Sequence, residues 1–163
     1  MRVELLHPPG ARSCRDDDGD PGLGGVWVDA EDLAREGGPR QSLARCLSGL
    51  NPVVRAHVFA ELTTLVLGAV RGELTFWDYE AKAGQVKQMV SKRRVLEIRF
   101  TGQIDPEGGH RHIRLYFTEP RHHPVLLALL LEWKADDPDG KPEQQRHILE
   151  ADRRIDRHYA TCP

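Results

Sequence analysis

The residues whose type and spacing suggest chemistry are two arginines in segments where apolar and polar residues alternate. Arg99 and Arg114 each lie in such a segment, in step with Glu97 and Tyr116. Since alternate side chains of a strand point to opposite faces, we expect these four on the open face of a sheet. The planar fork of arginine suits a phosphate group, so this face predicts a phosphate-binding surface. The alternative is a cross-strand ion pair at the surface, which would contribute little to stability.

A second group of basic residues lies near the C-terminal end of the sequence. Arg146, Arg153 and Arg157 are spaced seven and four residues apart, so on a helix they would share one face. His147 lies beside them, and a histidine with its ordinary pKa near neutrality can act as an acid or a base. An arginine stripe is more often a solvated helix face with intrahelical partners such as Asp152, and that interpretation is favoured.

Two histidine pairs and an acidic loop raise the question of metal binding. His110 and His112, and likewise His122 and His123, lie in or beside predicted turns, without a cysteine or a carboxylate at ligand spacing. The acidic residues between 136 and 139 lack the closing glutamate of a calcium-binding loop. We expect neither a metal site nor a cofactor.

The elements that must position the two arginines follow from the spacing of apolar residues. We expect strands over residues 95–100 and 112–118, each with one apolar face. The continuous apolar run at 125–131 fits a central strand covered on both faces. A helix over residues 142–159 would close the chain. Its apolar stripe comprises Ile148, Ala151, Ile155 and His158 or Tyr159.

The first half of the chain predicts further helices. Asn51 and Pro52 form a typical helix start, because asparagine caps the first turn and proline fits the first helical position. A shorter helix is expected over residues 40–50 and a short strand at 26–28. The apolar stripe of the longer helix comprises Val54, Val58, Leu62, Leu65 and Ala69. This order of elements predicts an α+β protein, with a helical hairpin and a C-terminal helix packed on a small antiparallel sheet.

The segment from residue 72 to residue 94 carries a weaker pattern. Three aromatic side chains are expected to pack, namely Phe76, Trp77 and Tyr79. Five basic residues would leave a basic edge, namely Lys82, Lys87, Lys92, Arg93 and Arg94.

Charge and flexibility divide the chain unevenly. Residues 1–22 are rich in proline, glycine and aspartate, so we expect a disordered acidic tail before a single domain of residues 23–163. Residues 1–36 carry 4 basic and 9 acidic side chains, and the rest of the chain carries 19 and 16. A mildly basic body is compatible with a polyanionic partner but does not require one.

Length and composition exclude several classes of protein. A chain of 163 residues, 39% hydrophobic and 29% charged, fits a soluble domain. No stretch approaches the ~20 apolar residues of a membrane span, and the first residues lack the pattern of a secretory signal. The 3 scattered cysteines argue against a disulfide framework. We therefore expect a cytoplasmic protein that does not bind membranes.

Five segments are similar to those of a known family, and their order and spacing agree over four consecutive elements. They are LSGLNPVVRAHVFAELTTL (residues 47–65), RVLEIRF (94–100), HIRLYF (112–117), VLLALLLEWK (125–134) and KPEQQRHILEADRRIDRHY (141–159). Together they resemble the RelE/HigB superfamily of bacterial toxins, which includes phage-derived HigB-like proteins. The likeness covers roughly residues 40–160. It implies a RelE-like toxin fold.

Toxins of this superfamily usually act as ribosome-dependent endoribonucleases. The resemblance therefore implies the toxin of a type II toxin–antitoxin pair, which inhibits translation by metal-independent cleavage of mRNA. Its partners would be the ribosome, mRNA and a cognate antitoxin, expected to be a helix-turn-helix protein. ParE-type toxins share the fold, act on gyrase and carry no nuclease site, so fold alone does not settle activity. The alternative is a non-catalytic binding module, either a gyrase-directed toxin or an inactive phage remnant.

The resemblance also implies roles for individual residues. Cleavage through the 2′-hydroxyl needs a base, cations near the reacting phosphate and an acid for the leaving oxygen. Arg99 and Arg114 match phosphate-binding arginines of the family, and Lys134 matches a lysine after its fourth strand. The family's catalytic tyrosine aligns best with Ile148, which is apolar, so His147 is the expected acid or base. RNA binding is expected from Tyr116, Arg146, Arg153 and Arg157.

Overall fold

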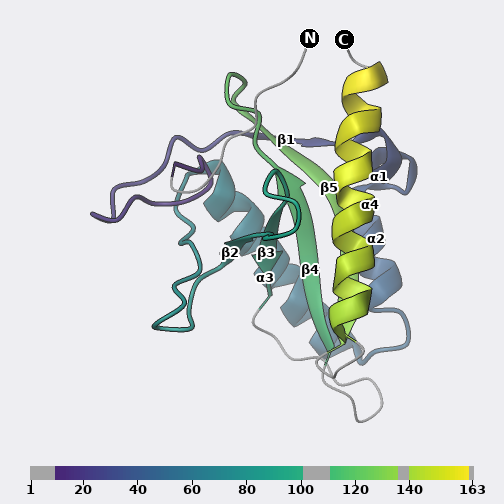
Figure 1. Ribbon diagram of the computed structural model, residues 1–163. Helices are drawn as coiled ribbons and strands as arrows, with labels where there is room; N and C mark the ends of the chain where they lie inside the picture. Colours follow the sequence, from purple (N-terminus) through teal and green to yellow (C-terminus); the bar gives the residue numbers. More distant parts are fainter. Residues whose placement is uncertain (1–9, 101–110, 136–139, 162–163) are drawn as a thin grey trace.

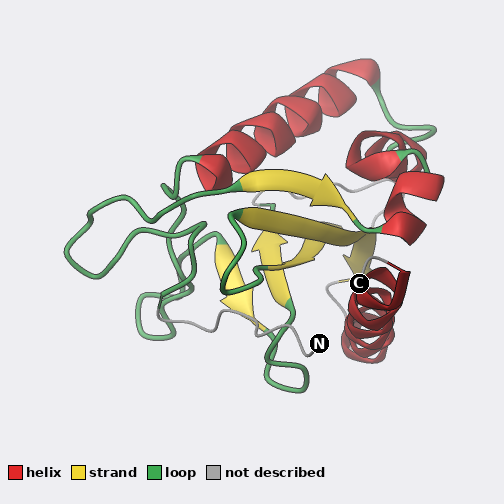
Figure 2. Ribbon diagram, turned by 90° about the horizontal axis from the view of Figure 1, so that it is seen from above, coloured by secondary structure: helices red, strands yellow, loops and turns green. Residues whose placement is uncertain are grey.

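The structure of the chain is a computed structural model, and it describes residues 10–100, 111–135 and 140–161. In chain order the elements are β1 (Val26–Asp29), α1 (Glu31–Arg35), α2 (Gly38–Cys46), α3 (Pro52–Val70), β2 (Val86–Gln88), β3 (Leu96–Arg99), β4 (Arg111–Thr118), β5 (Val125–Ala135) and α4 (Gly140–Thr161). One sheet separates two layers of helices. α2 and α3 lie on one side of it and α4 on the other (Figures 1 and 2). The predicted α+β class is confirmed.

The sheet has five strands in the order β1-β5-β4-β3-β2. β2, β3, β4 and β5 pair in antiparallel fashion, as expected. β1, however, pairs parallel to β5, so the prediction of a purely antiparallel sheet is wrong. The chain crosses one face of the sheet through α1, α2 and α3 and reaches β2 at the far edge of the sheet. Three successive antiparallel pairings then bring β5 back beside β1, running in the same direction.

The helical crossover buries its predicted apolar stripe. Four of the five stripe residues of α3 are buried in the core, namely Val58, Leu62, Leu65 and Ala69. Val54, the first stripe residue, is 38% exposed because it lies in the first turn, before the helix reaches the core. The predicted helix start is confirmed, since the side chain of Asn51 accepts a hydrogen bond from the backbone N–H of Val53 over 2.8 Å.

The opposite face of the sheet packs against α4. Ile148, Ala151 and Ile155 of α4 are buried with Leu127 and Leu129 of β5. Leu126 and Leu131 of β5 instead join the core under α2 and α3. β5 is therefore covered on both faces, which confirms the interpretation of its continuous apolar run.

The front of the chain is more ordered than its composition predicts. Residues 1–9 lie outside the described part, but residues 11–14 are buried. The backbone N–H groups of Arg12 and Ser13 donate to the two carboxylate oxygens of buried Glu119, over 2.7 and 3.0 Å. The backbone N–H of Gly22 donates a hydrogen bond to the carbonyl oxygen of Gly72 over 2.7 Å. Backbone hydrogen bonds therefore place part of a segment that has few apolar side chains to bury and whose composition predicts disorder.

α3 is long and apolar enough to cross a membrane by length and composition, so the expectation that no stretch approaches a membrane span is wrong by this criterion. One helix of this kind is weak evidence for a span, because core helices of soluble proteins share both properties. α3 covers one face of the sheet (Figure 2), and four of its side chains join the core there, namely Val58, Leu62, Leu65 and Ala69.

Ion pairs fasten the loop before β3 to α4. Lys92 Nζ lies 2.9 Å from Asp152 Oδ2, and the guanidinium of Arg94 bonds both Asp152 and Asp156. Burial alone would raise the pKa of Asp152, but the hydrogen bonds from Arg94 and Lys92 hold that pKa below its ordinary value. Asp152 and Asp156 therefore pair with Lys92 and Arg94 and not with the arginines of α4, for which the sequence predicted intrahelical partners of this kind.

This ion-pair cluster predicts a dependence of stability on pH. Because the pKa of Asp152 is depressed in the folded state, its contribution is complete above the ordinary value of 3.8 and is lost as the pH falls through the lower folded value. We expect the free energy of unfolding of Asp152→Asn to fall less steeply between about pH 5 and pH 2 than that of the native chain, measured by urea denaturation. Equal slopes would contradict the ion-pair assignment.

Candidate nucleic-acid interface

The two arginines of the predicted phosphate-binding face do share one face of the sheet. Arg99 of β3 is the register partner of Arg114 of β4, and Glu97 is the partner of Tyr116. Lys87 of β2 pairs with Glu97 and therefore points to the same side. This common side is the one that α4 covers in part.

Most of that face is buried, which corrects the expectation that it is open. The side chains of Arg114 and Glu97 are each 2% exposed, and Tyr116 is fully buried. Arg114 Nε lies 3.2 Å from Glu97 Oε1, and the amide of Gln144 on α4 donates to the other oxygen of Glu97. The cross-strand ion pair of the alternative interpretation exists, but it lies inside the protein and not at the surface, because α4 packs over it.

His147 of α4 joins this buried group. Its ring meets that of Tyr116 edge-on, with centroids 6.2 Å apart. Burial lowers the pKa of His147, so the ring is neutral at pH 7. Burial also raises the pKa of Tyr116 above its ordinary range. Among the described residues, the hydroxyl of Tyr116 has no hydrogen-bond partner. Three of the predicted site residues, Arg114, Tyr116 and His147, thus come together beneath α4.

Lys134 lies at one end of the same face. It is the register partner of His112 on β4, two residues before Arg114, and its side chain is half-buried. The side chains of residues 135–139, which follow it, lie outside the description. The structure therefore places Lys134 on the predicted face.

The three arginines of α4 that were predicted to bind RNA differ in exposure and in their ion pairs. Arg157 is held by Asp32 and Glu150 over 2.7 and 2.6 Å, so it ties α4 to α1. Arg153 is 69% exposed and Arg146 is exposed too. The structure thus supports the interpretation that this stripe is largely a solvated, ion-paired face.

Arg154 was not singled out by the sequence, yet it is the most deeply placed arginine of α4. Its guanidinium donates to the carbonyl oxygen of Leu129 over 2.9 Å and pairs with Glu36 and Glu150. No spacing rule separates it from its neighbour Arg153, because only the packing of α4 on the sheet decides which of two adjacent arginines turns inward.

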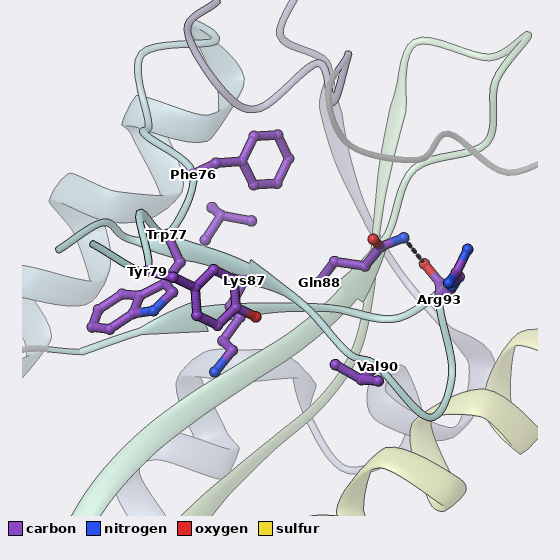
Figure 3. Close-up of a pocket in the computed structure, with 8 residues that line it drawn as sticks. Phe76, Trp77, Tyr79, Lys87, Gln88, Val90 and Arg93 are labelled. Carbon is purple, nitrogen blue, oxygen red and sulfur yellow. Dashed lines mark hydrogen bonds between the residues drawn. The ribbon is translucent and has the colours of Figure 1, made fainter. Parts of the chain in front are cut away.

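Arg99 extends the polar face to the edge of the sheet, where it meets aromatic rings. Its Cζ lies 3.9 Å from the ring centroid of Trp77. Lys87 Nζ lies 5.2 Å from the centroid of Tyr79 and 5.8 Å from that of Trp77 (Figure 3). We call Trp77, Tyr79, Lys87, Arg93 and Arg99 the aromatic–basic platform.

A hollow of about 390 Å³ lies on the platform. Its lining comprises Phe76, Trp77, Tyr79, Val86, Lys87, Gln88, Val90 and Arg93. The side-chain amide of Gln88 donates to the carbonyl oxygen of Arg93 over 2.7 Å, which fixes the turn at one end of the hollow (Figure 3). Tyr79 is 66% exposed and Val90 83% exposed, so aromatic and apolar surface is presented to solvent.

The backbone around the hollow is closely tied. The N–H of Trp77 donates to the carbonyl oxygen of Val86 over 2.7 Å. Asp78 closes the turn by accepting from the N–H groups of Glu80 and Ala81. Gly84 has a φ of +134°, and a Cβ there would lie 2.4 Å from the carbonyl oxygen of Phe76. The rings are therefore held by a fixed hairpin.

The platform was only partly foreseen. Of the five residues predicted as a basic edge, Lys87 and Arg93 belong to the platform, whereas Lys92 and Arg94 pair with aspartates of α4. The prediction that the aromatic residues pack is right for Phe76 and Trp77, which are half-buried, and wrong for Tyr79. The spacing of 72–94 has no strand or helix period, so it could not show that β2 brings Lys87 beside Arg99.

Within residues 10–100, 111–135 and 140–161, no group of His, Cys, Asp or Glu side chains has the arrangement of a metal site. Comparison with protein-family models, with curated proteins and with solved structures finds no match to this chain. The platform and the buried cluster beneath α4 must therefore be interpreted from their chemistry.

Proposed function

We propose that this chain is a binding module for single-stranded RNA and that the RNA binds on the aromatic–basic platform. The observation that carries the proposal is the exposed ring of Tyr79 with Lys87 beside it and Arg99 stacked on Trp77. Proteins that bind single strands combine such rings, on which bases stack, with cations that meet the phosphates.

The surroundings of the platform support a single strand over a duplex. Tyr79 lies in a hollow beside an edge strand, and a ring presented in this way can stack on a base of a single strand, whereas the bases of a duplex are stacked on one another. One of the two arginines to which the resemblance gives a phosphate-binding role, Arg114, is enclosed with Glu97. Binding without cleavage, the alternative left open by the sequence, is therefore the function that the geometry favours. The proposal goes with a cytoplasmic location.

The proposal predicts that Tyr79→Ala weakens RNA binding about tenfold, because stacking of one base is worth about 1–3 kcal/mol. Lys87→Ala should weaken binding and lower the dependence of log affinity on log salt by about 0.7, the share of one phosphate contact in a single strand. Both are measured by fluorescence anisotropy of a short labelled RNA across a salt series.

Arg153→Ala is the matched control. It removes one cation from an exposed position on α4, so it alters net charge as Lys87→Ala does. We expect it to leave the affinity nearly unchanged. A loss with Arg153→Ala and none with Tyr79→Ala would place the RNA on α4 and refute the platform. Duplex RNA and single-stranded DNA of the same sequence complete the comparison, and tighter binding of the duplex would also refute it.

A second candidate is the metal-independent endoribonuclease of a type II toxin–antitoxin pair, with a helix-turn-helix antitoxin as its partner. What favours it is that Arg99, Arg114, Tyr116 and Lys134 lie on one face of the sheet. Expression in a bacterial host with a cell-free ribosome assay tests it. Cleavage of mRNA by the native chain that is lost in Arg99→Ala would establish the nuclease. Intact mRNA and normal growth would contradict the nuclease and favour the binding module.

A further inference from the structure

β1 forms one edge of the sheet and pairs on one side with β5. Among the residues that the structure describes, no strand pairs with its other side. The backbone N–H groups of Val26 and Ala30 donate to carbonyl oxygens of β5 and of the residue before it, both over 2.8 Å. Because the backbone groups of successive strand residues point to alternate sides, those of Trp27 and Asp29 point to the outer edge. β1 therefore presents two N–H and two carbonyl groups with which another strand can pair.

This edge lacks the lysine, proline and bulge that usually prevent pairing with another chain. β1 reads Val-Trp-Val-Asp, and its register with β5 has no shift. Its first three residues are of the types that favour strands. Val26 is 64% exposed and Val28 is 39% exposed, so an added strand would also cover apolar surface. An edge of this kind is typical of a strand that accepts a peptide from another molecule.

A groove of about 440 Å³ lies beside this edge, on the face of the sheet that α3 covers. Its apolar lining comes from Trp27 of β1 and from Leu62, Val66 and Leu67 of α3. The indole N–H of Trp27 donates to the carbonyl oxygen of Val66 over 2.9 Å, so the ring is fixed. Since alternate residues of a strand point to one face, Trp27 and Asp29 both face the groove. An added strand would place a side chain opposite each of them.

The carboxylate of Asp29 gives the groove a negative charge that lacks a partner. Asp29 is half-buried, and burial raises its pKa above the ordinary 3.8 without a cation or a hydrogen-bond donor to offset the rise. Arg40 of α2 also lines the groove, but it is exposed, and among the described residues no ion pair joins it to Asp29. A cation carried by a partner would therefore be paired at a place where the chain itself supplies none.

These observations define what binds at the edge. The groove favours an apolar side chain opposite Trp27 and a basic side chain opposite Asp29, two residues apart on one face of the added strand. A second copy of β1 does not fit, because its four residues include no cation. We propose that β1 and this groove bind an extended segment of a partner protein, which adds a strand to the sheet and carries a basic residue two positions from an apolar one.

Selection from a library of random displayed peptides, with the native chain immobilised, tests the chemistry of the partner. We expect enriched peptides to carry lysine or arginine two positions before a large apolar residue, the order that an antiparallel strand presents to Trp27 and Asp29. Selection against Asp29→Lys should instead enrich an acidic residue at the basic position. Glu73→Lys is the matched control, because it makes the same change of charge at an exposed residue, and it should enrich the basic pattern. No enrichment, or the same peptides from the native chain and Asp29→Lys, would overturn the proposal.

N-methylation of an enriched peptide tests whether its main chain pairs with β1. Methylation at the apolar residue removes the N–H that would donate to the carbonyl oxygen of Trp27, and it should weaken binding about tenfold. Methylation at the residue between the basic and apolar positions is the matched control, because that N–H points away from β1, and it should have little effect. Equal losses would contradict the addition of a strand.

Leu67→Ser tests the groove itself. Leu67 is 48% exposed at the groove, so loss of its apolar side chain should weaken binding of the enriched peptide about tenfold. Leu149→Ser is the matched control, since Leu149 is 37% exposed on α4, and it should bind as the native chain does. Circular dichroism shows that each variant is folded.

Two further measurements distinguish other occupants and the RNA site. Sedimentation equilibrium that shows a dimer of the native chain, dissociated by the enriched peptide, would mean that a second copy occupies β1 and would overturn the proposal. The aromatic–basic platform lies at the opposite edge of the sheet, on β2. Tyr79→Ala should therefore bind the enriched peptide as tightly as the native chain, whether or not it has lost affinity for RNA.

Discussion

Replacing Arg114 with methionine is expected to lower the free energy of unfolding by about 3 kcal/mol. The substitution leaves the carboxylate of Glu97 buried without its closest counter-charge, and an unpaired buried charge is strongly destabilising. Gln144 still donates to Glu97, and Arg99 Nε lies 3.9 Å from Glu97 Oε1. These two remaining contacts keep the expected loss at the lower end of the range for broken buried pairs. Urea denaturation measures it.

The double variant Glu97→Leu with Arg114→Met is the decisive control. Removing both charges should recover most of the lost stability, since replacing a buried ion pair with apolar residues is often neutral. A free energy of unfolding of Arg114→Met within about 1 kcal/mol of the native value would show that the pair of Glu97 and Arg114 is solvated. It would mean that α4 does not enclose this face, and the phosphate-binding interpretation of Arg114 would then regain its basis.

The same variant separates the two candidate functions. Arg114 does not belong to the aromatic–basic platform, so the folded Arg114→Met protein should bind single-stranded RNA as tightly as the native chain. If RNA instead reaches the face beneath α4, the affinity of Arg114→Met for RNA should be lower than that of the native chain, because the variant lacks the positive charge of Arg114. Comparison with Lys87→Ala, which removes a cation on the part of the same face that α4 leaves uncovered, distinguishes the two.

The sequence predicted which strand residues share a face but not what covers them. The alternation in the segments around Arg99 and Arg114 separates an apolar face from a polar face. From this pattern alone, every charged side chain is expected to face water. β5 carried the missing information: its continuous apolar run requires cover on both sides. A neighbour in the same sheet, such as β4, must then lie partly under the same helix.

Where the sequence lacks periodicity, the structure depends on contacts between distant segments. β2 spans Val86–Gln88, too short for any period to show, and it is defined by its pairing with β3. The segment around Arg12 has few apolar residues, and its order comes from Glu119, more than a hundred residues later. Neither pairing has a local signal in one sequence.

Replacing Glu119 with alanine is expected to cost about 4 kcal/mol of stability, because it removes the acceptor for two buried backbone donors. The N–H groups of Arg12 and Ser13 would be left without partners, and each buried donor left unsatisfied costs about 1–3 kcal/mol. We also expect faster proteolysis within residues 10–22, because this segment has lost its anchor. Urea denaturation and limited proteolysis measure the two effects.

Glu73→Ala is the matched control. It removes an exposed carboxylate that pairs with Arg71, and a surface pair contributes less than about 1 kcal/mol. Burial raises the pKa of Glu119, so the folded state favours its protonated form. Its contribution is therefore complete at low pH and falls as the pH rises through the raised folded pKa. The difference between the native chain and Glu119→Ala should be larger at about pH 4 than at about pH 7. A difference equal to that of Glu73→Ala would show that Glu119 does not anchor the front of the chain.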